Sequence, residues 1–445
     1  MDTHSSAVPP LLPPGAADPA TAVATAGQDG DDLAPDTGRR FDRATTFRFG
    51  AGFLLFGLLW IVGLMTISSV LLPQRLKDIG VSSPETLLGT INAVTAVVSL
   101  VSNLVFGNFS DRTRGRLGRR TPWVVGGGLL GGAAMLSMGL VDSAGLITLL
   151  YCVAMVGLNM MLAPAVAVLS DRVPGRLRGT MSAFYGTGLS VGTPLGTLVG
   201  AALITSGLTG FVLGGALMAV SALVAVVLWP RERPATDLPA VPTTLKDVLV
   251  SFRPPRSAPD FYKAFVGRLF MLVSYQMISA YQLYIVQDHL GQSTARSAAT
   301  LATMSVITLV VSLLGSLVSG PVSDLIGRRK LPVVLSSVLF AVGIAMPWVW
   351  PSSAGMFAYA AIAGLGYGVY TSVDQALNVD VLPNQSDAGK DLGILNLSTT
   401  AGQTVGPLIT SSLVVATGGY GLVFPVAIVM ALLGAFAITR IRAVR

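Results

Sequence analysis

Arg268 and Asp374 are ionisable residues that lie inside two long apolar runs of the sequence, at 262–285 and 355–378. Arg268 follows the start of its run by some six residues, and Asp374 precedes the end of its run by about four to six. At about 1.5 Å per residue in a helix, both lie about 6–9 Å inside their runs. Equal depth favours an ion pair, because an unpaired charge in an apolar medium is costly. Two interpretations are open: Asp374 gains and loses a proton while Arg268 competes for it, or the pair is structural and never titrates.

Neutral polar residues also lie in the apolar runs, at the spacing of one helix face. Tyr275, Ser279 and Gln282 continue the face that begins at Arg268, with steps near 3.6 residues. Such side chains are costly in lipid and face a cavity or a partner. Amides and phenols supply the hydrogen bonds that a neutral polyol requires, and a tryptophan ring at mid-depth can stack on a sugar face. The expected cavity residues are Trp60, Asn159, Tyr275, Gln282, Tyr367, Asn396 and Gln403. For each of them the alternative is a hydrogen bond between helices or ordinary packing.

Twelve apolar runs must position these residues. A helix needs about 20 mostly apolar residues to span the hydrocarbon core of a bilayer. Hydrophobic residues make up 52% of the chain and charged residues only 11%, whereas a soluble domain carries about 25% charge. We therefore expect an all-α membrane protein with twelve transmembrane helices. The runs lie near 49–72, 86–108, 122–141, 145–169, 180–205, 208–229, 262–285, 297–319, 331–349, 355–378, 392–414 and 419–439.

Few residues suited to catalysis or metal binding are present. The chain has two histidines, His4 and His289, and one cysteine, Cys152. These are too few for an HExxH helix, a Cys/His zinc cluster or a disulfide framework, and the GxxxxGKS/T phosphate loop is missing. No set of nucleophile, base and acid can be assembled from the side chains inside the runs. The sequence therefore predicts a protein that is not an enzyme and that holds no metal and no cofactor.

Basic residues predict how the chain is oriented. Lys and Arg accumulate in cytoplasmic segments, and with the N-terminus inside, 25 of the 29 basic residues fall on that side. We expect a multi-pass plasma-membrane protein with both termini in the cytoplasm, whose basic excess faces anionic lipid and not nucleic acid. Residues 1–46 are rich in Pro, Ala, Gly and Asp and lack the charge order of a signal peptide, so they predict a disordered tail.

The chain contains an internal repeat. GNFSD at 107–111, followed by GRRTPWVV, returns as GPVSD at 320–324, followed by GRRKLPVV, so that Asp111 and Asp324 are 213 residues apart. Pro194 and Pro407 have the same separation. These echoes predict two pseudo-symmetric six-helix bundles joined by a cytoplasmic linker, with bounds of 47–229, 259–445 and 230–258. Parallel halves of this kind are a transporter architecture that holds a substrate between them near the middle of the bilayer.

The arginine-rich loop after the second run carries a family resemblance. SDRTRGRLGRRTPW at 110–123 resembles the loop signature of the major facilitator superfamily, and its return after the eighth run strengthens the likeness. The longer form is similar to glycoside–pentoside–hexuronide:cation symporters and to plant-type sucrose–proton symporters, as are VDQALNVDVLP and GKDLGILN in the second half. The resemblance covers residues 47–445. It implies a secondary active transporter that moves a small polar solute, a sugar or glycoside, by proton-coupled alternating access; we expect it to act as a monomer.

The same resemblance implies a role for the charged loops. Asp111 ends one helix near the start of the next, where a carboxylate accepts hydrogen bonds from helix N-terminal amides and from arginines. The likeness implies a cytoplasmic gate that latches helix ends together in one state and releases them in the other. Its residues are Asp111, Arg112, Arg119, Arg120, Asp324, Arg328 and Arg329. The alternative is that the arginines only hold the loops on the cytoplasmic side.

One departure from the family concerns the coupling ion. Sodium-using members of the glycoside branch carry carboxylates within the second and fourth spans, whereas the runs at 86–108 and 145–169 hold neither Asp nor Glu. A proton is therefore expected in preference to sodium. Facilitated passage without a coupling ion is the remaining alternative.

Drug–proton export is the nearest competing function, because the same fold exports amphipathic compounds. Exporters often carry a G-x-x-x-G-P-x-x-G run in the fifth span, where this chain has GLSVGTPLG at 188–196, with Thr193 splitting the Gly–Pro pair. The closer match, GQTVGP at 402–407, lies in the eleventh span. A membrane receptor without transport is disfavoured, because the tail and the linker are too short to form a sensing domain.

Overall fold

The computed structural model describes residues 33–236, 255, 258–326, 330–382 and 388–442, and its regular structure there is helical apart from one isolated bridge between Leu33 and Arg40. The first half holds α2 (Arg43–Met65), the π-helix η1 (Thr66–Leu71), α3 (Leu72–Asp78), α4 (Pro84–Arg112), α5 (Thr121–Met138), α6 (Ala144–Arg172), α7 (Gly175–Ala202) and α8 (Gly207–Leu228). The second half holds α10 (Pro259–Ser279), α11 (Gln282–Tyr284), the π-helix η2 (Ile285–His289), α12 (Thr294–Ile326), α13 (Lys330–Val349), α14 (Ser353–Asp380), α15 (Ala388–Thr417) and α16 (Val423–Thr439).

These elements form twelve helical segments within the described residues, when α2–η1–α3 and α10–α11–η2 each count as one. In the part of the chain that the structure describes, eight stretches are long and apolar enough to cross a membrane, and the composite segment α10–α11–η2 makes a ninth, bent by 47°. α16 is apolar but has only 17 residues. α7 and α15 are long but rich in Gly, Ser and Thr. Their lower hydropathy has a structural reason, because both contribute polar side chains to the cavity described below.

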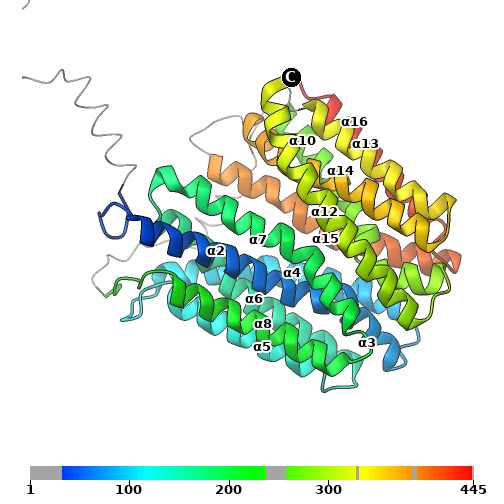
Figure 1. The fold of residues 1–445 in the computed structure, drawn as a ribbon, viewed down its shortest axis with the longest axis horizontal. Helices are drawn as coiled ribbons and strands as arrows, with labels where there is room; N and C mark the ends of the chain where they lie inside the picture. Colours follow the sequence, from blue (N-terminus) through cyan, green and yellow to red (C-terminus); the bar gives the residue numbers. More distant parts are fainter. Residues whose placement is uncertain (1–32, 237–254, 256–257, 327–329, 383–387, 443–445) are drawn as a thin grey trace, which may run out of the picture.

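The helices form two bundles with the same packing pattern. α2 packs against α7 and α8, and its counterpart α10 packs against α15 and α16. α5 packs against α6 and α8, just as α13 packs against α14 and α16. Figure 1 shows the first bundle in blue to green across the lower part of the view and the second in yellow-green to red at the upper right. The bundles meet where α4 contacts α15 and where α7 contacts α12.

Glycines allow the helices of the first bundle to approach closely. A Cβ atom added to Gly157 of α6 would lie 2.4 Å from the backbone nitrogen of Gly131 in α5. On the other side of α5, a Cβ atom on Gly132 would lie 2.4 Å from the carbonyl oxygen of Gly215 in α8. Small residues serve this purpose in membrane helices, where packing and not the hydrophobic effect drives association.

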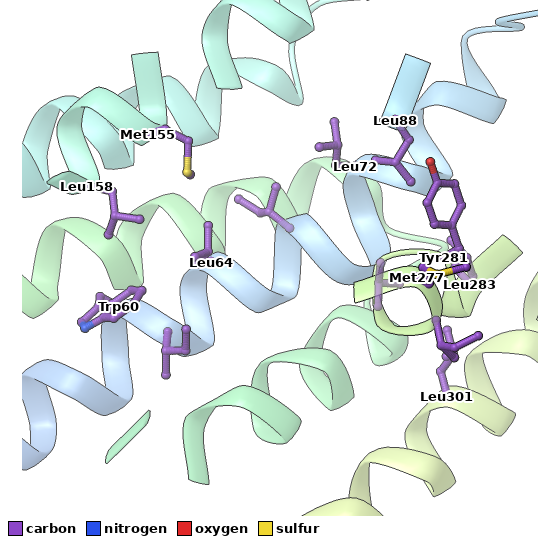
Figure 2. Packing of buried hydrophobic residues seen from close by; sticks show 14 of the residues in the cluster. Trp60, Leu64, Leu72, Leu88, Met155, Leu158, Met277, Tyr281, Leu283 and Leu301 are labelled. Atoms are coloured by element: carbon purple, nitrogen blue, oxygen red, sulfur yellow. The ribbon is translucent and has the colours of Figure 1, made fainter. Parts of the chain in front are cut away.

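The helices of the protein run between two ends, which we call the basic end and the opposite end. The basic end is where α2 and α5 begin and where α4 and α6 end, each at an arginine. The opposite end is where α3 and η2 terminate, and here the two bundles are joined. The Tyr281 hydroxyl donates to the carbonyl oxygen of Glu85 at 3.0 Å, and the Tyr284 hydroxyl donates to that of Pro73 at 2.9 Å. Figure 2 shows Tyr281 beside Leu72 and Leu88 of the first bundle.

Two further side-chain contacts join the bundles at the opposite end. Lys77 Nζ lies 2.5 Å from Asp288 Oδ1 and 4.8 Å from the centre of the Tyr284 ring. Gln287 Nε2 donates a hydrogen bond of 2.8 Å to Gln74 Oε1, and these residues are 213 positions apart. Because 213 is the repeat spacing of the sequence, the two glutamines occupy equivalent positions in the two bundles.

Candidate functional site

A cavity of about 350 Å³ lies between the two bundles. The first bundle lines it with residues of α2, η1, α4, α6 and α7, and the second with residues of α10, α11, α12 and α15. None of the described residues that line it is charged. Its polar lining consists of hydroxyls, amides and phenols, from Ser68, Ser69, Asn92, Thr95, Ser99, Tyr151, Thr193, Thr197, Tyr275, Gln276, Ser279, Gln282, Ser305, Thr308 and Gln403.

Three of the predicted cavity residues line this cavity. Tyr275 projects from α10, Gln282 from α11 and Gln403 from α15. α10 ends at Ser279 and the chain bends by 47° before Gln282. The helical spacing that grouped Tyr275, Ser279 and Gln282 therefore continues across a break, and all three still face the same cavity.

The other four predicted cavity residues lie outside the lining. Trp60 is buried in the hydrophobic core, near Leu158 in Figure 2 and one turn before the lining residue Leu64. Asn159 is held between helices, since its Nδ2 donates to the Met155 carbonyl oxygen at 2.9 Å and its Oδ1 accepts from Asn103 at 3.3 Å. Asn396 lies beside the charged residue Arg268, 3.5 Å from its Nη2.

Tyr367 lies directly behind the cavity wall. Its ring stacks on the ring of Tyr275, with centroids 4.0 Å apart and planes inclined by 8°. Tyr367 therefore contacts a lining residue without lining the cavity itself.

The serines and threonines that line the cavity were not among the residues predicted from the sequence. Thr95 Oγ1 donates to the Ile91 carbonyl oxygen, Thr193 Oγ1 to that of Leu189 and Ser305 Oγ to that of Leu301. A hydroxyl bonded to its own helix carries no conspicuous cost in lipid, so its presence in an apolar run signals little. The pair Thr193 and Thr197, spaced by one turn, was the detectable signal in α7.

Arg268 and Asp374 form a buried ion pair within the second bundle. Arg268 Nη1 lies 2.5 Å from Asp374 Oδ2, and the exposed fractions of the two side chains are 9% and 4%. Arg268 belongs to α10 and Asp374 to α14, so the pair links two helices. Their equal depth in the sequence led to this pairing, and the structure brings the two residues together.

Neutral groups complete the surroundings of the pair. Arg268 Nη2 donates to Thr399 Oγ1 of α15 at 3.3 Å, and Asn378 Nδ2 donates to Asp374 Oδ2 at 3.0 Å. Asp374 Oδ1 and the Tyr370 hydroxyl are buried and have no hydrogen-bond partner among the described residues. The carboxylate therefore has one oxygen without a hydrogen-bond partner, one helical turn from the Tyr370 hydroxyl.

A charged cluster occupies the basic end of the first bundle. Arg120 is buried and contacts two carboxylates, Asp111 Oδ1 at 2.5 Å and Asp171 Oδ2 at 2.8 Å. Arg119 Nη2 also lies 2.8 Å from Asp171 Oδ2. Of the residues expected to form a gate, Asp111, Arg119 and Arg120 are thus joined within one bundle. Arg112 has a partner of its own. Arg328, Arg329 and the side chain of Asp324 lie outside the described part of the chain.

Glu232, just after α8, closes this cluster. Its carboxylate accepts hydrogen bonds from the backbone N–H groups of Arg119, Arg120 and Thr121, at 2.9 to 3.0 Å. These groups are the unpaired donors at the start of α5, where a negative charge is also favoured by the helix dipole. Gly118 has φ +87°, and a Cβ atom there would lie 2.3 Å from the Glu232 carboxylate. The start of the linker is therefore fastened to the loop between α4 and α5.

No group of three or more His, Cys, Asp or Glu residues in the described part of the chain is placed to hold a metal ion. The chemistry that the site offers is hydrogen bonding in a neutral cavity, with one buried ion pair beside it.

The sequence matches the family described as Major Facilitator Superfamily, over residues 49–307 and 264–444. No curated protein matches the chain in sequence.

Solved structures of membrane transporters are similar to the chain. A bacterial homologue of the human lysosomal transporter Spinster, inward-facing and unoccupied, has a TM-score of 0.64 and 16% identity, with 90% of this chain and 95% of that chain covered. Its inward-facing, occupied structure has a TM-score of 0.63, 15% identity and the same coverage. The nucleoside transporter NupG has a TM-score of 0.67 and 13% identity, with 88% of this chain and 99% of that chain covered.

Proposed function

The chain belongs to the Major Facilitator Superfamily, and from this premise we propose that it carries a neutral, polyhydroxylated solute across the membrane in symport with protons. A transporter of this family is a membrane protein that is not an enzyme. Sugars and glycosides are the solutes that we assign to it. The resemblance of its loops to those of the glycoside and sucrose symporter branch supports this assignment.

The solute class follows from the lining of the cavity. Fifteen polar residues reach it, and every one is a hydroxyl, an amide or a phenol. These groups donate and accept hydrogen bonds in the pattern that a polyol presents. A charged solute would be left without a counter-charge in a site of low dielectric constant, which is costly. The neutral lining therefore disfavours cationic drugs and anionic metabolites.

Proton coupling is assigned to Asp374 and Arg268. The pair is buried and separate from the cavity, two helical turns from the lining residue Tyr275 along α10. Protonation of Asp374 would cancel its attraction for Arg268 and free α10 to move relative to α14. Ionisable residues within membrane helices commonly form such proton relays.

The basic end is assigned to the cytoplasm. Arginines at the ends of α4 and α6 and at the start of α2 support this assignment, by the positive-inside rule. On this assignment the contacts at the opposite end close the outer side, which supports an inward-open conformation. In this state Asp111 pairs with Arg120 of its own bundle, which is the arrangement expected of a released cytoplasmic latch.

The deciding experiment is a thermal-shift panel on the purified full chain. It compares neutral disaccharides and glycosides with nucleosides, which the similar transporter NupG carries by its name, and with cationic amphipathic drugs. Stabilisation by a disaccharide or glycoside supports the proposal. Stabilisation by a drug alone would assign export instead, and by a nucleoside alone would reassign the solute. The control is the variant Gln282→Leu/Gln403→Leu, which removes two lining amides. The solute should no longer raise its unfolding temperature.

Coupling is tested separately in proteoliposomes. An inward proton gradient should drive the solute above its external concentration, and an equal sodium gradient should not. Uptake that stops at the external concentration under both gradients contradicts coupling but leaves the solute assignment standing.

A further inference from the structure

Three tyrosines connect the cavity to the buried ion pair. Tyr275 lines the cavity, and its ring stacks on Tyr367 with centroids 4.0 Å apart. The Tyr367 ring lies 6.4 Å from the ring of Tyr370, at an inclination of 20°. Tyr370 lies one helical turn before Asp374 on α14, so the two side chains share a face. The column therefore begins at the solute site and ends at the carboxylate.

At the end of this column next to Asp374, two polar atoms have no hydrogen-bond partner among the described residues. The Tyr370 hydroxyl and Asp374 Oδ1 are both buried, and neither has a hydrogen-bond partner among the described residues. The two groups are nevertheless close enough to interact, so that a small movement brings them into hydrogen-bond contact. A buried polar group without a partner is costly, and in a native structure such a group calls for an explanation, of which a functional role is one. The geometry offers each atom to the other.

We propose that Tyr370 is the positioning residue that receives Asp374 when this carboxyl takes up a proton, and that the Tyr275–Tyr367 stack makes this step respond to the solute. The inference rests on the proposed proton symport. A proton on Asp374 Oδ1 becomes a donor, and the Tyr370 oxygen within one turn is its acceptor. Arg268 then keeps Thr399 and Asn396 as neutral partners. The step breaks one O–H bond of a hydronium ion and forms one on Asp374 Oδ1, and a water molecule is left.

The solute acts on the other end of the column. Tyr275 is both a wall of the cavity and the upper ring of the stack, so a bound solute fixes the orientation of its ring. Face-to-face rings 4.0 Å apart cannot tilt independently. Occupancy therefore biases the position of Tyr367 and, through it, of Tyr370.

Few other groups face the carboxylate. Among the described residues, the charged or titratable side chains that interact with Asp374 are Arg268 from α10 and Tyr367 and Tyr370 from α14. Tyr367 interacts with both members of the ion pair. The remaining contact is the neutral amide of Asn378. A change in the titration of Asp374 can therefore be assigned to one of these residues.

The first test measures the titration of Asp374 directly. The infrared carbonyl stretch of a protonated carboxyl is followed against pH in the full chain, and the band is assigned to Asp374 by its loss in Asp374→Asn. In Tyr370→Phe, which removes only the hydroxyl, the protonated form loses its acceptor. The midpoint of the band should then fall by about one pH unit, a tenfold change in proton affinity. An unchanged midpoint, or a band that no pH produces, overturns the inference.

The second test uses transport. Tyr370→Phe should shift the half-maximal proton-driven uptake to lower pH while solute counterflow stays within about twofold of the wild type, since exchange needs no net proton movement. Tyr367→Leu removes the stacking of this ring on Tyr275. In this variant the solute affinity should change less with pH than in the wild type. The control is Tyr420→Phe, which removes another buried hydroxyl without a partner, at the opposite end.

The outcomes separate this inference from the proposed function. If uptake is proton-driven and Asp374→Asn abolishes accumulation, but Tyr370→Phe changes neither midpoint nor profile, the tyrosine column is excluded and proton symport stands. If the wild type shows no proton-driven uptake, the proposed coupling fails. The infrared titration then still decides whether Tyr370 positions the Asp374 carboxyl.

Discussion

Lys77 Nζ and Asp288 Oδ1 lie 2.5 Å apart and join the two bundles at the opposite end, where the alternating access that we propose has to separate them. The side chains are 22% and 38% exposed. A partly exposed pair of this kind contributes at most about 1 kcal/mol. That is still enough to change the ratio of two conformations about fivefold.

Lys77→Met should therefore favour the outward-open conformation without unfolding the protein. We expect faster alkylation, from the outer side, of a single cysteine placed at the cavity residue Leu64 in a Cys152→Ser background. Arg75→Met is the matched control, because Arg75 pairs with Asp142 inside one bundle, at 2.6 Å. Equal alkylation rates in both variants would show that the Lys77 contact does not hold the outer side closed.

Asp374→Asn should abolish accumulation against a gradient and retain counterflow. It should also lower the free energy of unfolding by about 3–5 kcal/mol, because Arg268 is left as an unpaired buried charge. The double variant Arg268→Gln/Asp374→Asn removes both charges and should recover most of that stability without restoring accumulation. Thermal unfolding in detergent and proteoliposome uptake measure the two effects. Surviving accumulation in Asp374→Asn would end the coupling role.

Gln403→Leu should raise the KM for the solute about tenfold, the effect of one lost hydrogen bond of about 1.4 kcal/mol in a buried site. Asn159→Leu is the contrasting variant. It should leave KM unchanged, because Asn159 bonds to Asn103 and lies outside the cavity lining. A larger effect of Asn159→Leu on KM would mean that the solute reaches deeper toward α6 than the cavity does.

Gly157→Ala should lower stability by about 1–3 kcal/mol, as overpacking does in a close-packed interior. The added Cβ atom would meet the backbone of Gly131, which cannot rotate away as a side chain can. Gly179→Ala in α7 is the control, since nothing lies within 4 Å of a Cβ atom at that position. Thermal unfolding of the two variants in the same detergent should differ, and equal midpoints would contradict the close contact of α5 with α6.

Much of the fold could be predicted from the sequence, because membrane helices can be recognised by the length and hydropathy of their apolar runs. The repeat spacing predicted two equivalent bundles, and the packing pairs of α2 and α10 agree with that symmetry. The ion pair was also predictable, since a buried charge needs a partner at its own depth. Helix faces were predicted less well. Trp60 and Asn159 sit at mid-depth in their helices, but depth does not determine whether a side chain points to the cavity or to a neighbouring helix.

The cavity lining was the least predictable part. Its serines and threonines bond to their own helices, so no polarity pattern in the sequence marks them. The bend between Ser279 and Gln282 has no proline, and the π-helix η2 that follows it contains none either. The Glu232 contact joins residues 112 positions apart in sequence, a distance over which local patterns carry no information.

The glutamine pair at the opposite end has a consequence for how such a chain arose. Two identical side chains that meet on a twofold axis must be able to bind each other. Two lysines or two aspartates would instead repel each other there. A carboxamide is self-complementary, because it offers a donor and an acceptor on one side chain. Gln74 and Gln287 are therefore suited to an ancestral pair of separate, identical six-helix chains, and a present-day substitution at either position must be matched at the other.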